Sequence, residues 1–248
     1  MERKTRIEAA FSAAAAGYEA QAQAQVQTAD LVVSKLPELP PAAKVLELGC
    51  GTGLLTRRLL TRLSDEAQLL ATDLSPAMIQ QTRESTTDPR LSLAVMDAEH
   101  PKGLERGFDL ITSSLAAQWF TNLPATLAGL AGLLAPGGHL LIATLGARTF
   151  MEWRAAHAAQ GLASGVPDYP DAAELAAMLP GANACSEPFT LAYDNARTFL
   201  RALESIGAHT PRPGHKPLSA GKLRTIMTAL GSPCPITWDI LILSFTKN

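Results

Sequence analysis

The hydrophobic and polar positions follow a helical period at the start of the chain. Between residues 5 and 35, apolar side chains recur at steps of three or four residues, at Ile7, Phe11, Ala14, Tyr18, Ala22 and Val26. This spacing lines one face of an α-helix. The stretch LPELPP at residues 36–41 ends the pattern, because proline does not continue a helix. The pattern therefore predicts one helix over 5–35.

Short apolar runs then alternate with helical patterns. Strands are predicted at 45–48, 69–72, 91–95, 108–112 and 139–144. Helical spacing is found between them at 54–63, 76–85 and 123–133, and the sequence APGG at 135–138 predicts a turn before the fifth strand. Alternation of this kind predicts a doubly wound α/β fold, a mostly parallel sheet with helices on both faces.

The last hundred residues are less regular. We expect helices within 150–180, with a loop at SGVPDYPD, and further helices at 196–207 and 219–230. Strands are expected at 188–194 and 236–245, and a proline-rich basic loop at 208–217. No repeat or low-complexity linker divides the chain, so we expect a single domain. Its segments are a helical N-terminal part (1–40), a core (41–146) and a part that covers the substrate (147–248).

Composition narrows the class of protein. The chain has 248 residues, 47% of them hydrophobic, and a net charge of −2. No apolar run approaches the roughly 18 residues of a membrane span, and no overall positive field would attract nucleic acid. The three cysteines have no CxxC spacing, and the histidines have no metal-ligand spacing. We therefore expect a cytoplasmic protein with no metal, no membrane and no nucleic acid partner.

The stretch VLELGCGTGLL at 45–55 contains three glycines, at 49, 51 and 53, between a predicted strand and a predicted helix. Glycine permits positive φ and lets a ligand lie against bare backbone. The dinucleotide fingerprint G-x-G-x-x-G needs a glycine at position 54, which is leucine here. Glu47, two residues before the loop, suits a cationic ligand better than a pyrophosphate. The expected ligand contacts are Glu47, Gly49, Cys50, Gly51 and Gly53; the alternative is a tight turn without a ligand.

Polar side chains end the next strands. Asp73 follows the glycine loop by about twenty residues, where a carboxylate accepts hydrogen bonds from ribose hydroxyls in such sheets. Ser75 is expected to cap the helix at 76–85, which is also the alternative role for Asp73. Leu74 and Met78 would then flank an adenine. The third and fourth strands end near residues that we expect to contact the same ligand, Asp97, Ala98 and Ser113.

These pieces in this order resemble the class I S-adenosylmethionine-dependent methyltransferases. The matching stretches are the glycine loop, TDLS at 72–75, MDAE at 96–99 and LAPGG at 134–138. The resemblance implies a seven-stranded sheet of order 3-2-1-4-5-7-6 with an antiparallel last strand, and S-adenosylmethionine as the cofactor.

The flanking regions resemble a narrower family, the malonyl-acyl-carrier-protein O-methyltransferases of biotin synthesis. The similar stretches are IEAAFSAAAAGYEAQAQAQ, SSLAAQW and FLRALESIGAHT. The resemblance implies methyl transfer to the free malonyl carboxylate of malonyl-acyl-carrier protein or malonyl-CoA. TFMEWRAAH and GLASGVPDYPD do not match the family pattern closely.

A malonyl carboxylate is ionised at neutral pH, so its methylation needs no general base. It does need a cation when it is taken out of water. Arg201 is the residue that we expect to hold it; the alternative is an exposed ion pair between Arg201 and Glu204. Tyr18 is expected either to pack in the core or to close over the cofactor with the N-terminal helix as a lid. Gln118 and Trp119 are expected to line the acceptor site.

Two groups of basic residues are candidates for docking an acidic carrier protein, although such groups are usually solvated surface. The first comprises Arg57, Arg58 and Arg62, and the second Arg212, His215, Lys216, Lys222 and Arg224. Three other functions stay open from the residues: a class I methyltransferase acting on another small carboxylate, phenol or amine, a non-catalytic nucleotide-binding protein, and, less compatible with the glycine spacing, an NAD enzyme.

Overall fold

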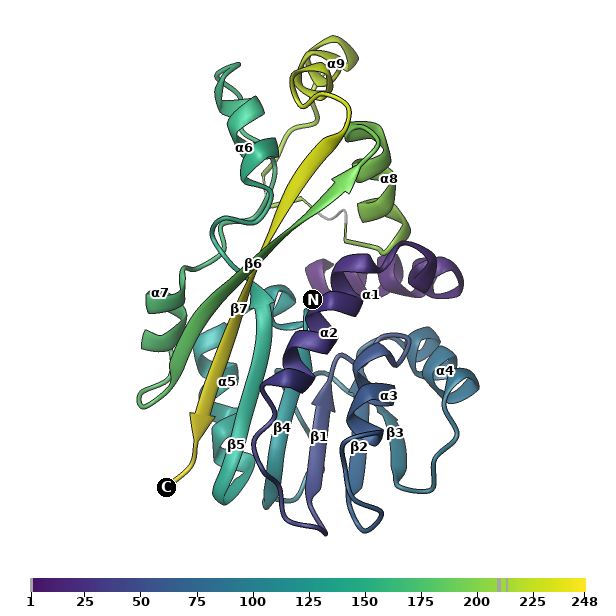
Figure 1. Ribbon diagram of the computed structural model, residues 1–248, viewed down its shortest axis with the longest axis vertical. Coiled ribbons are helices and arrows are strands. Elements are labelled where there is room, and N and C mark those ends of the chain that lie inside the picture. Colours follow the sequence, from purple (N-terminus) through teal and green to yellow (C-terminus); the bar gives the residue numbers. More distant parts are fainter. Residues whose placement is uncertain (1, 209–210, 213) are drawn as a thin grey trace.

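The computed structural model describes residues 2–208, 211–212 and 214–248, so part of the predicted loop at 208–217 lies outside the described residues. Its centre is one sheet of seven strands in the order β3-β2-β1-β4-β5-β7-β6 (Figure 1). The strands are β1 (Lys44–Leu48), β2 (Gln68–Asp73), β3 (Leu91–Val95), β4 (Phe108–Ser114), β5 (Leu134–Leu145), β6 (Asn183–Tyr193) and β7 (Cys234–Thr246). β7 runs antiparallel to both of its neighbours. The predicted fold class and strand order are confirmed.

Both faces of the sheet are buried. Along the central strands, neighbouring residues belong to different hydrophobic clusters: Val45 and Leu110 face one side, Leu46 and Ile111 the other. Successive side chains of a strand point to opposite faces. This explains why these strands are continuous apolar runs rather than alternating ones.

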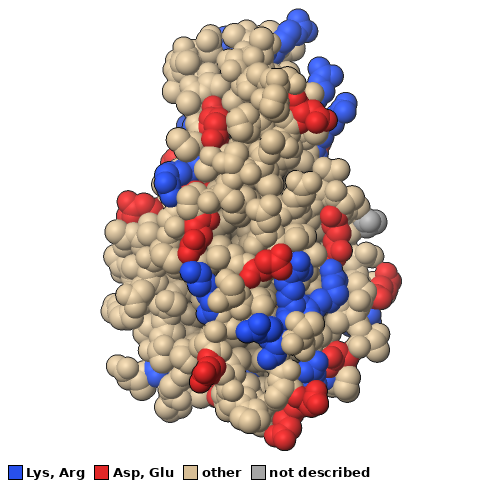
Figure 2. Space-filling view, in the orientation of Figure 1, with Lys and Arg blue, Asp and Glu red and all other residues tan. Residues whose placement is uncertain are grey.

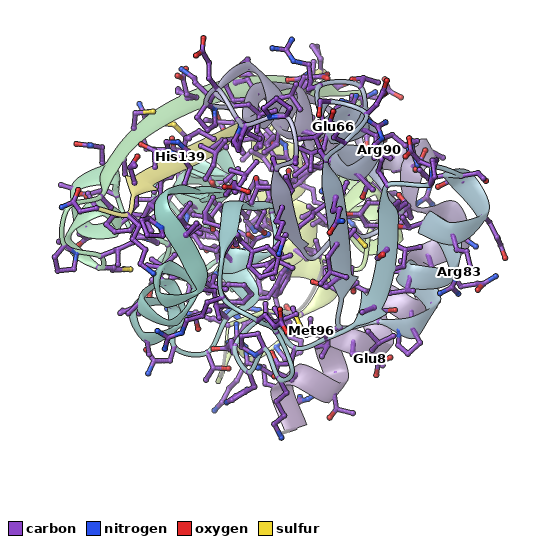
Figure 3. The ribbon with its side chains drawn as sticks, turned by 90° about the horizontal axis from the view of Figure 1, so that it is seen from below. Glu8, Glu66, Arg83, Arg90, Met96 and His139 are labelled. Carbon is purple, nitrogen blue, oxygen red and sulfur yellow. The ribbon has the colours of Figure 1, made fainter. Side chains whose placement is uncertain are left out.

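The two faces are covered by different helices (Figure 3). α2 (Gln23–Ser34) and α3 (Leu54–Leu60) contribute to the cluster of Val45, whereas α5 (Leu123–Leu133) and α7 (Ala172–Ala177) contribute to the cluster of Leu46. α4 (Pro76–Ser85) packs along β2 and β3. The predicted helices at 76–85 and 123–133 have the observed boundaries.

The prediction of one continuous helix over 5–35 is wrong. α1 (Glu2–Ala14) is followed by a 3₁₀-helix, η1 (Ala15–Gln21), and only then by α2. Ala22, at the bend between η1 and α2, is fully buried, and Glu19 accepts hydrogen bonds from Thr52 and Arg57. These tertiary contacts override the local helical period. As a result α2 packs on α3, while α1 crosses above the carboxyl ends of the strands (Figure 1).

The long strands β6 and β7 extend past the rest of the sheet (Figure 1). Around their far end lie α6 (Met151–Ala158), α8 (Ala196–Ser205) and α9 (Ala220–Ala229). Both strands begin earlier in the sequence than predicted, and the predicted turn APGG is part of β5, where the pairing with β4 shifts register. In the part of the chain that the structure describes, no helix is long and apolar enough to cross a membrane.

Candidate active site

The glycine loop joins β1 to α3 through three left-handed residues. Gly49, Gly51 and Gly53 have φ of 68°, 57° and 89°. A Cβ on Gly49 would lie 2.4 Å from the Cβ of Ala116, which follows β4. The loop therefore needs glycine at position 49 for its backbone conformation and for the close approach of a neighbouring chain segment.

Asp73, at the end of β2, organises this loop. Its Oδ2 accepts a hydrogen bond from the N–H of Gly51 at 2.9 Å, and its Oδ1 accepts one from the N–H of Ser75 at 2.8 Å. Burial raises the pKa of Asp73 above its usual value, against the opposing effect of these bonds. Ser75 caps α4 by accepting from the N–H of Met78. Capping is thus supplied by Ser75, and the Asp73 carboxylate borders a cavity.

This cavity, here called the cofactor cavity, lies between the carboxyl ends of the strands and α1. Its floor and walls include seven predicted contact residues, namely Gly49, Gly51, Asp73, Leu74, Met78, Asp97 and Ala98. Lys4, Ile7 and Phe11 of α1 border it from above. Figure 3 shows Met96, another wall residue, and Glu8 of α1 toward the same side of the molecule. Ligands of open α/β sheets bind at this edge.

Four predicted contact residues do not line the cofactor cavity. Glu47 lies beneath the loop, 1% exposed, and accepts a hydrogen bond from the Thr56 hydroxyl at 2.7 Å. Burial raises the pKa of Glu47 to about 8. Cys50 is buried beside Thr82, and Gly53 is the residue that precedes α3.

Ser113 is the fourth. Its buried hydroxyl donates to the carbonyl of Leu48 on the adjacent strand, and the next residue, Ser114, borders the cavity instead. A shift of one residue moves a side chain to the other face of a strand. The direct contacts predicted for these four residues stay predictions.

Lys4 is a cavity residue that the sequence analysis missed. Its Nζ lies 2.6 Å from Oδ2 of Asp97 and 2.6 Å from Oε2 of Glu99. Burial of Asp97 opposes ionisation, but the hydrogen bonds from Lys4, His100 and the Glu99 N–H, with the Lys4 charge, together outweigh it, so the pKa of Asp97 lies below its usual value. Lys4 ties α1 to the ends of the third strand and its following turn.

A second cavity, here called the acceptor cavity, lies next to the first. Phe11, Tyr18, Leu115 and Trp119 border both cavities. Most of the other wall is apolar and aromatic, including Phe150, Trp153, Phe199 and Trp238. Leu115 and Phe150 have φ of 55° and 57°, a conformation that is strained for non-glycine residues and is concentrated at functional sites.

The residues predicted around the acceptor are partly brought together here. Trp119 packs edge-on against Phe11, with ring centroids 5.5 Å apart. Gln118 borders the acceptor cavity, and its Nε2 donates to the carbonyl of Leu115 at 2.7 Å. Tyr18 borders both cavities, and burial raises the pKa of its hydroxyl.

Arg201 lies elsewhere. Its side chain is exposed on α8, whereas Leu200 and Leu203 of the same helix border the acceptor cavity. Successive helical residues point about 100° apart, which turns Arg201 away from the wall formed by its neighbours. Its role towards an acceptor carboxylate stays a prediction. Among the described residues, the acceptor cavity is bordered by neither lysine nor arginine; its polar wall includes Gln25, Tyr169 and His215, none of which the sequence analysis assigned to this wall.

The two basic groups differ in their pairing. Arg57 contacts Glu19 and Arg58 contacts Asp30, both from the N-terminal segment. Figure 2 shows acidic side chains among the basic ones on the lower half of this face, where Figure 1 draws α2 and α3. In the second group, Lys216 and Arg224 are exposed, and Arg212 lies 3.9 Å from Asp168. Docking of a carrier at either group stays a prediction.

A sheet of this order, with a left-handed glycine loop and an acid at the end of the second strand, defines a class I methyltransferase. The methyltransferase-domain family matches residues 45–138. A methyltransferase solved in complex with the Haloferax volcanii Trm112 methyltransferase activator has the same fold, with a TM-score of 0.63 at 18% identity over 98% of each chain.

Comparison with curated proteins gives the particular family. The malonyl-[acyl-carrier protein] O-methyltransferase of Magnetococcus marinus is 39% identical over 222 residues, which are 87% of this chain and 82% of that one. The biotin biosynthesis bifunctional protein BioCD of Bordetella avium is 44% identical over 220 residues, but this chain spans only 47% of its length. The chain belongs to the malonyl-[acyl-carrier protein] O-methyltransferase family.

Proposed function

We propose that this chain transfers the methyl group of S-adenosylmethionine to the free carboxylate of a malonyl group carried by acyl carrier protein or CoA. The product is a malonyl methyl ester, which enters biotin synthesis. Family membership supports the donor and the acceptor. The observation that carries the proposal is the junction of the two cavities at Phe11, Tyr18, Leu115 and Trp119, because methyl transfer needs donor and acceptor side by side.

The cofactor cavity fits S-adenosylmethionine. Asp73 offers a buried carboxylate where ribose hydroxyls are bound in such sheets, and charge-assisted hydrogen bonds contribute about 1.5–3 kcal/mol each. Leu74 and Met78 supply apolar walls for adenine, and Asp97 supplies an acceptor for its amino group. A Cβ on Gly51 would meet no atom within 4 Å, so this glycine leaves room beside the loop. The fit needs no phosphate-binding glycine at position 54.

The acceptor cavity suits attack of the malonyl carboxylate on the methyl group. The bound donor supplies an electrophilic methyl group, so the carboxylate needs no base to attack it. The protein has to align the two groups and exclude water, and alignment alone lowers a barrier by several kcal/mol. Trp119 and Phe11 form an apolar wall at the junction, and the Tyr18 hydroxyl is a hydrogen-bond donor there.

We also propose that three segments of the chain have different roles. Residues 1–40 cover the cofactor and act as a lid, residues 41–146 bind the cofactor, and residues 147–248 cover the acceptor. Lys4, Ser12 and Glu19 support the lid role, because they contact Asp97, Ser75 and Arg57 of the central segment.

One experiment tests the proposed function. The protein is incubated with S-adenosylmethionine labelled in its methyl group and with malonyl-acyl-carrier protein, malonyl-CoA and a panel of small carboxylates, phenols and amines. We expect a labelled methyl ester on the malonyl thioesters, detected by mass. Transfer to another acceptor with none to malonyl thioesters would reject the substrate. Calorimetry with no binding of S-adenosylmethionine would reject methyl transfer altogether.

A further inference from the structure

Gln25 stands out in the wall of the acceptor cavity. It lies in the first turn of α2, and it borders this cavity but not the cofactor cavity. Its Oε1 is buried and has no hydrogen-bond partner among the described residues. A buried polar atom without a partner destabilises the folded state, and native proteins leave few of them.

Gln118 shows what a satisfied amide looks like in the same wall. Its Nε2 donates to the Leu115 carbonyl, and its Oε1 accepts from the Thr144 hydroxyl at 3.3 Å. The two glutamines thus differ in kind. Gln118 is bonded within the protein, whereas the Gln25 oxygen has no partner among the described residues, although Gln25 borders the same cavity.

The chemistry of the malonyl thioester limits which of its groups can bond the Gln25 oxygen. A carbonyl oxygen accepts hydrogen bonds and needs a donor. The ionised malonyl carboxylate and the thioester carbonyl are both acceptors only. The first N–H donor along a malonyl thioester of carrier protein or CoA belongs to the amide of the pantetheine arm. That nitrogen lies six bonds from the carboxylate carbon, roughly 7 Å in an extended chain.

We propose that Gln25 recognises the pantetheine arm by accepting a hydrogen bond from its first amide N–H. The assignment rests on the proposed function. It agrees with the placement of Gln25 in the acceptor cavity alone, because the carboxylate has to lie at the junction and the arm has to lead away from it. In a mostly apolar cavity, a few polar groups fix the orientation of the ligand. Gln25 therefore sets how far the malonyl group reaches toward the junction.

The test compares two short substrates. One is the malonyl thioester of N-acetylcysteamine, which carries the first arm amide, and the other is its N-methyl analogue, which lacks only the N–H. With the unchanged protein we expect kcat/KM to be about tenfold higher for the N–H substrate. Gln25→Met should lower kcat/KM for the N–H substrate about tenfold and bring the ratio between the two substrates close to one.

Two controls make the result specific. Gln27→Met changes an exposed glutamine on the same helix and should keep the tenfold ratio. A malonyl S-alkyl thioester of equal length, which has no amide, should be methylated equally well by the unchanged protein and by Gln25→Met. This second comparison separates loss of the hydrogen bond from a packing effect of the substitution.

Several outcomes would overturn the assignment. Equal losses on all three thioesters in Gln25→Met would mean a packing role, and an unchanged protein that does not distinguish the N–H and N-methyl substrates would exclude the hydrogen bond even if the variant failed to fold. In both cases methyl ester would still form, so the proposed function would stand. If the unchanged protein methylated no malonyl thioester, the proposed function would fall and the role of Gln25 with it.

Discussion

The two cavities share four wall residues and differ in almost everything else. The cofactor cavity is bordered by charged groups, among them Lys4, Asp73, Asp97 and Glu99. The acceptor cavity is bordered mainly by aromatic and aliphatic side chains, and its polar groups are amides, hydroxyls and an imidazole. In the proposed reaction, the cofactor cavity places fixed charges beside S-adenosylmethionine, whose methyl group is already activated. The acceptor cavity offers an ionised malonyl carboxylate few polar partners, apart from the groups at the junction.

The cavities also differ in how they are assembled. The walls of the cofactor cavity come mostly from the loops that follow β1, β2, β3 and β4, whose ends adjoin in the sheet. The walls of the acceptor cavity include residues of α2, the segment 164–169, α8 and β7, which are far apart in sequence. The first site is thus a property of the sheet edge, and the second depends on packing between distant segments.

The largest effect is expected from Asp73→Asn in the cofactor cavity. The change keeps the size of the side chain but removes the charge that accepts from the Gly51 N–H at 2.9 Å. It would also weaken the bonds to ribose hydroxyls. We expect the dissociation constant of S-adenosylmethionine, measured by calorimetry, to rise at least about a hundredfold, equivalent to roughly 3 kcal/mol.

Asp109→Asn is the matched control. Asp109 lies on β4 and accepts from the N–H of Lys44 at the opposite end of the strands, so it should leave cofactor affinity unchanged. Normal affinity of Asp73→Asn for S-adenosylmethionine would mean that the cofactor does not bind in the charged cavity.

A second effect concerns the carboxyl group of Glu47, beneath the glycine loop. Because burial raises the pKa of Glu47 to about 8 from its usual value of 4.5, the folded protein keeps this carboxyl protonated where the unfolded chain ionises it. The associated stability is complete below pH 4.5 and is lost as the pH rises to about 8. Glu47→Gln removes this dependence. The difference in unfolding free energy between Glu47→Gln and the unchanged protein should grow in favour of the variant by about 3 kcal/mol between pH 5 and 7.5.

Chemical denaturation across that pH range measures the Glu47 effect, with Glu38→Gln at an exposed glutamate as the control. A difference that does not change with pH would mean that Glu47 is ionised beneath the loop. Glu47 would then carry a negative charge, which would suit a cationic ligand as the sequence analysis expects.

The two cavities were unequally predictable from the sequence. The glycine loop, Asp73 and the strand order follow from local periods and spacings, because each strand–loop unit is close in sequence. Within this half, the exact position at the end of a strand is harder to predict. Ser113 and Ser114 are equivalent in the sequence, and only the strand alternation shows that Ser114 is the one bordering the cavity.

The acceptor cavity offered no comparable signal. Gln25 was one of several glutamines in a helical pattern, and the break between η1 and α2 that positions it depends on contacts of Ala22 and Glu19 with distant residues. Arg201 is predicted from the family resemblance of the stretch FLRALESIGAHT, in which its neighbours are apolar. Those neighbours do face the cavity, but the helical period places Arg201 on another face. A local pattern gives the faces of a helix, and the tertiary structure decides what each face meets.

Arg201→Ala tests whether a cation from outside the apolar cavity takes part in the reaction. We expect kcat/KM for malonyl-acyl-carrier protein to fall about tenfold, or about 1.4 kcal/mol. This is less than the roughly 2–5 kcal/mol for losing a buried charge partner, because Arg201 is exposed beside the wall residues Leu200 and Leu203. Arg197→Ala, at an exposed arginine one turn earlier, is the control.

A short malonyl thioester separates two roles of Arg201. A loss of equal size on the short thioester assigns Arg201 to the carboxylate, whereas a loss confined to the carrier substrate assigns it to docking of the acidic carrier. Unchanged kinetics on both substrates would remove Arg201 from the reaction and leave the acceptor cavity without a cation from α8.

The smallest effect is expected where α1 closes the cofactor cavity. Lys4 lies 2.6 Å from carboxylate oxygens of Asp97 and of Glu99, and the Glu99 side chain is only 6% exposed. Partly buried pairs of this kind contribute more than exposed ones but remain sensitive to salt. If the pairs hold α1 over the bound cofactor, Lys4→Met should raise the dissociation rate of S-adenosylmethionine about threefold, a difference of under 1 kcal/mol. Stopped-flow displacement at low and high salt would measure the change.

The same contacts allow an opposite result, which makes the test decisive. Lys4 bonds both oxygens of Asp97, the residue proposed to accept from the adenine amino group. If Lys4 competes with the adenine, Lys4→Met would bind the cofactor more tightly and release it more slowly. Lys35→Met, which breaks an exposed pair with Glu187, should change neither rate. Slower release in Lys4→Met would mean that α1 is a competitor at the charged cavity, whereas faster release supports its role as a lid, because only a lid has to open before the cofactor leaves.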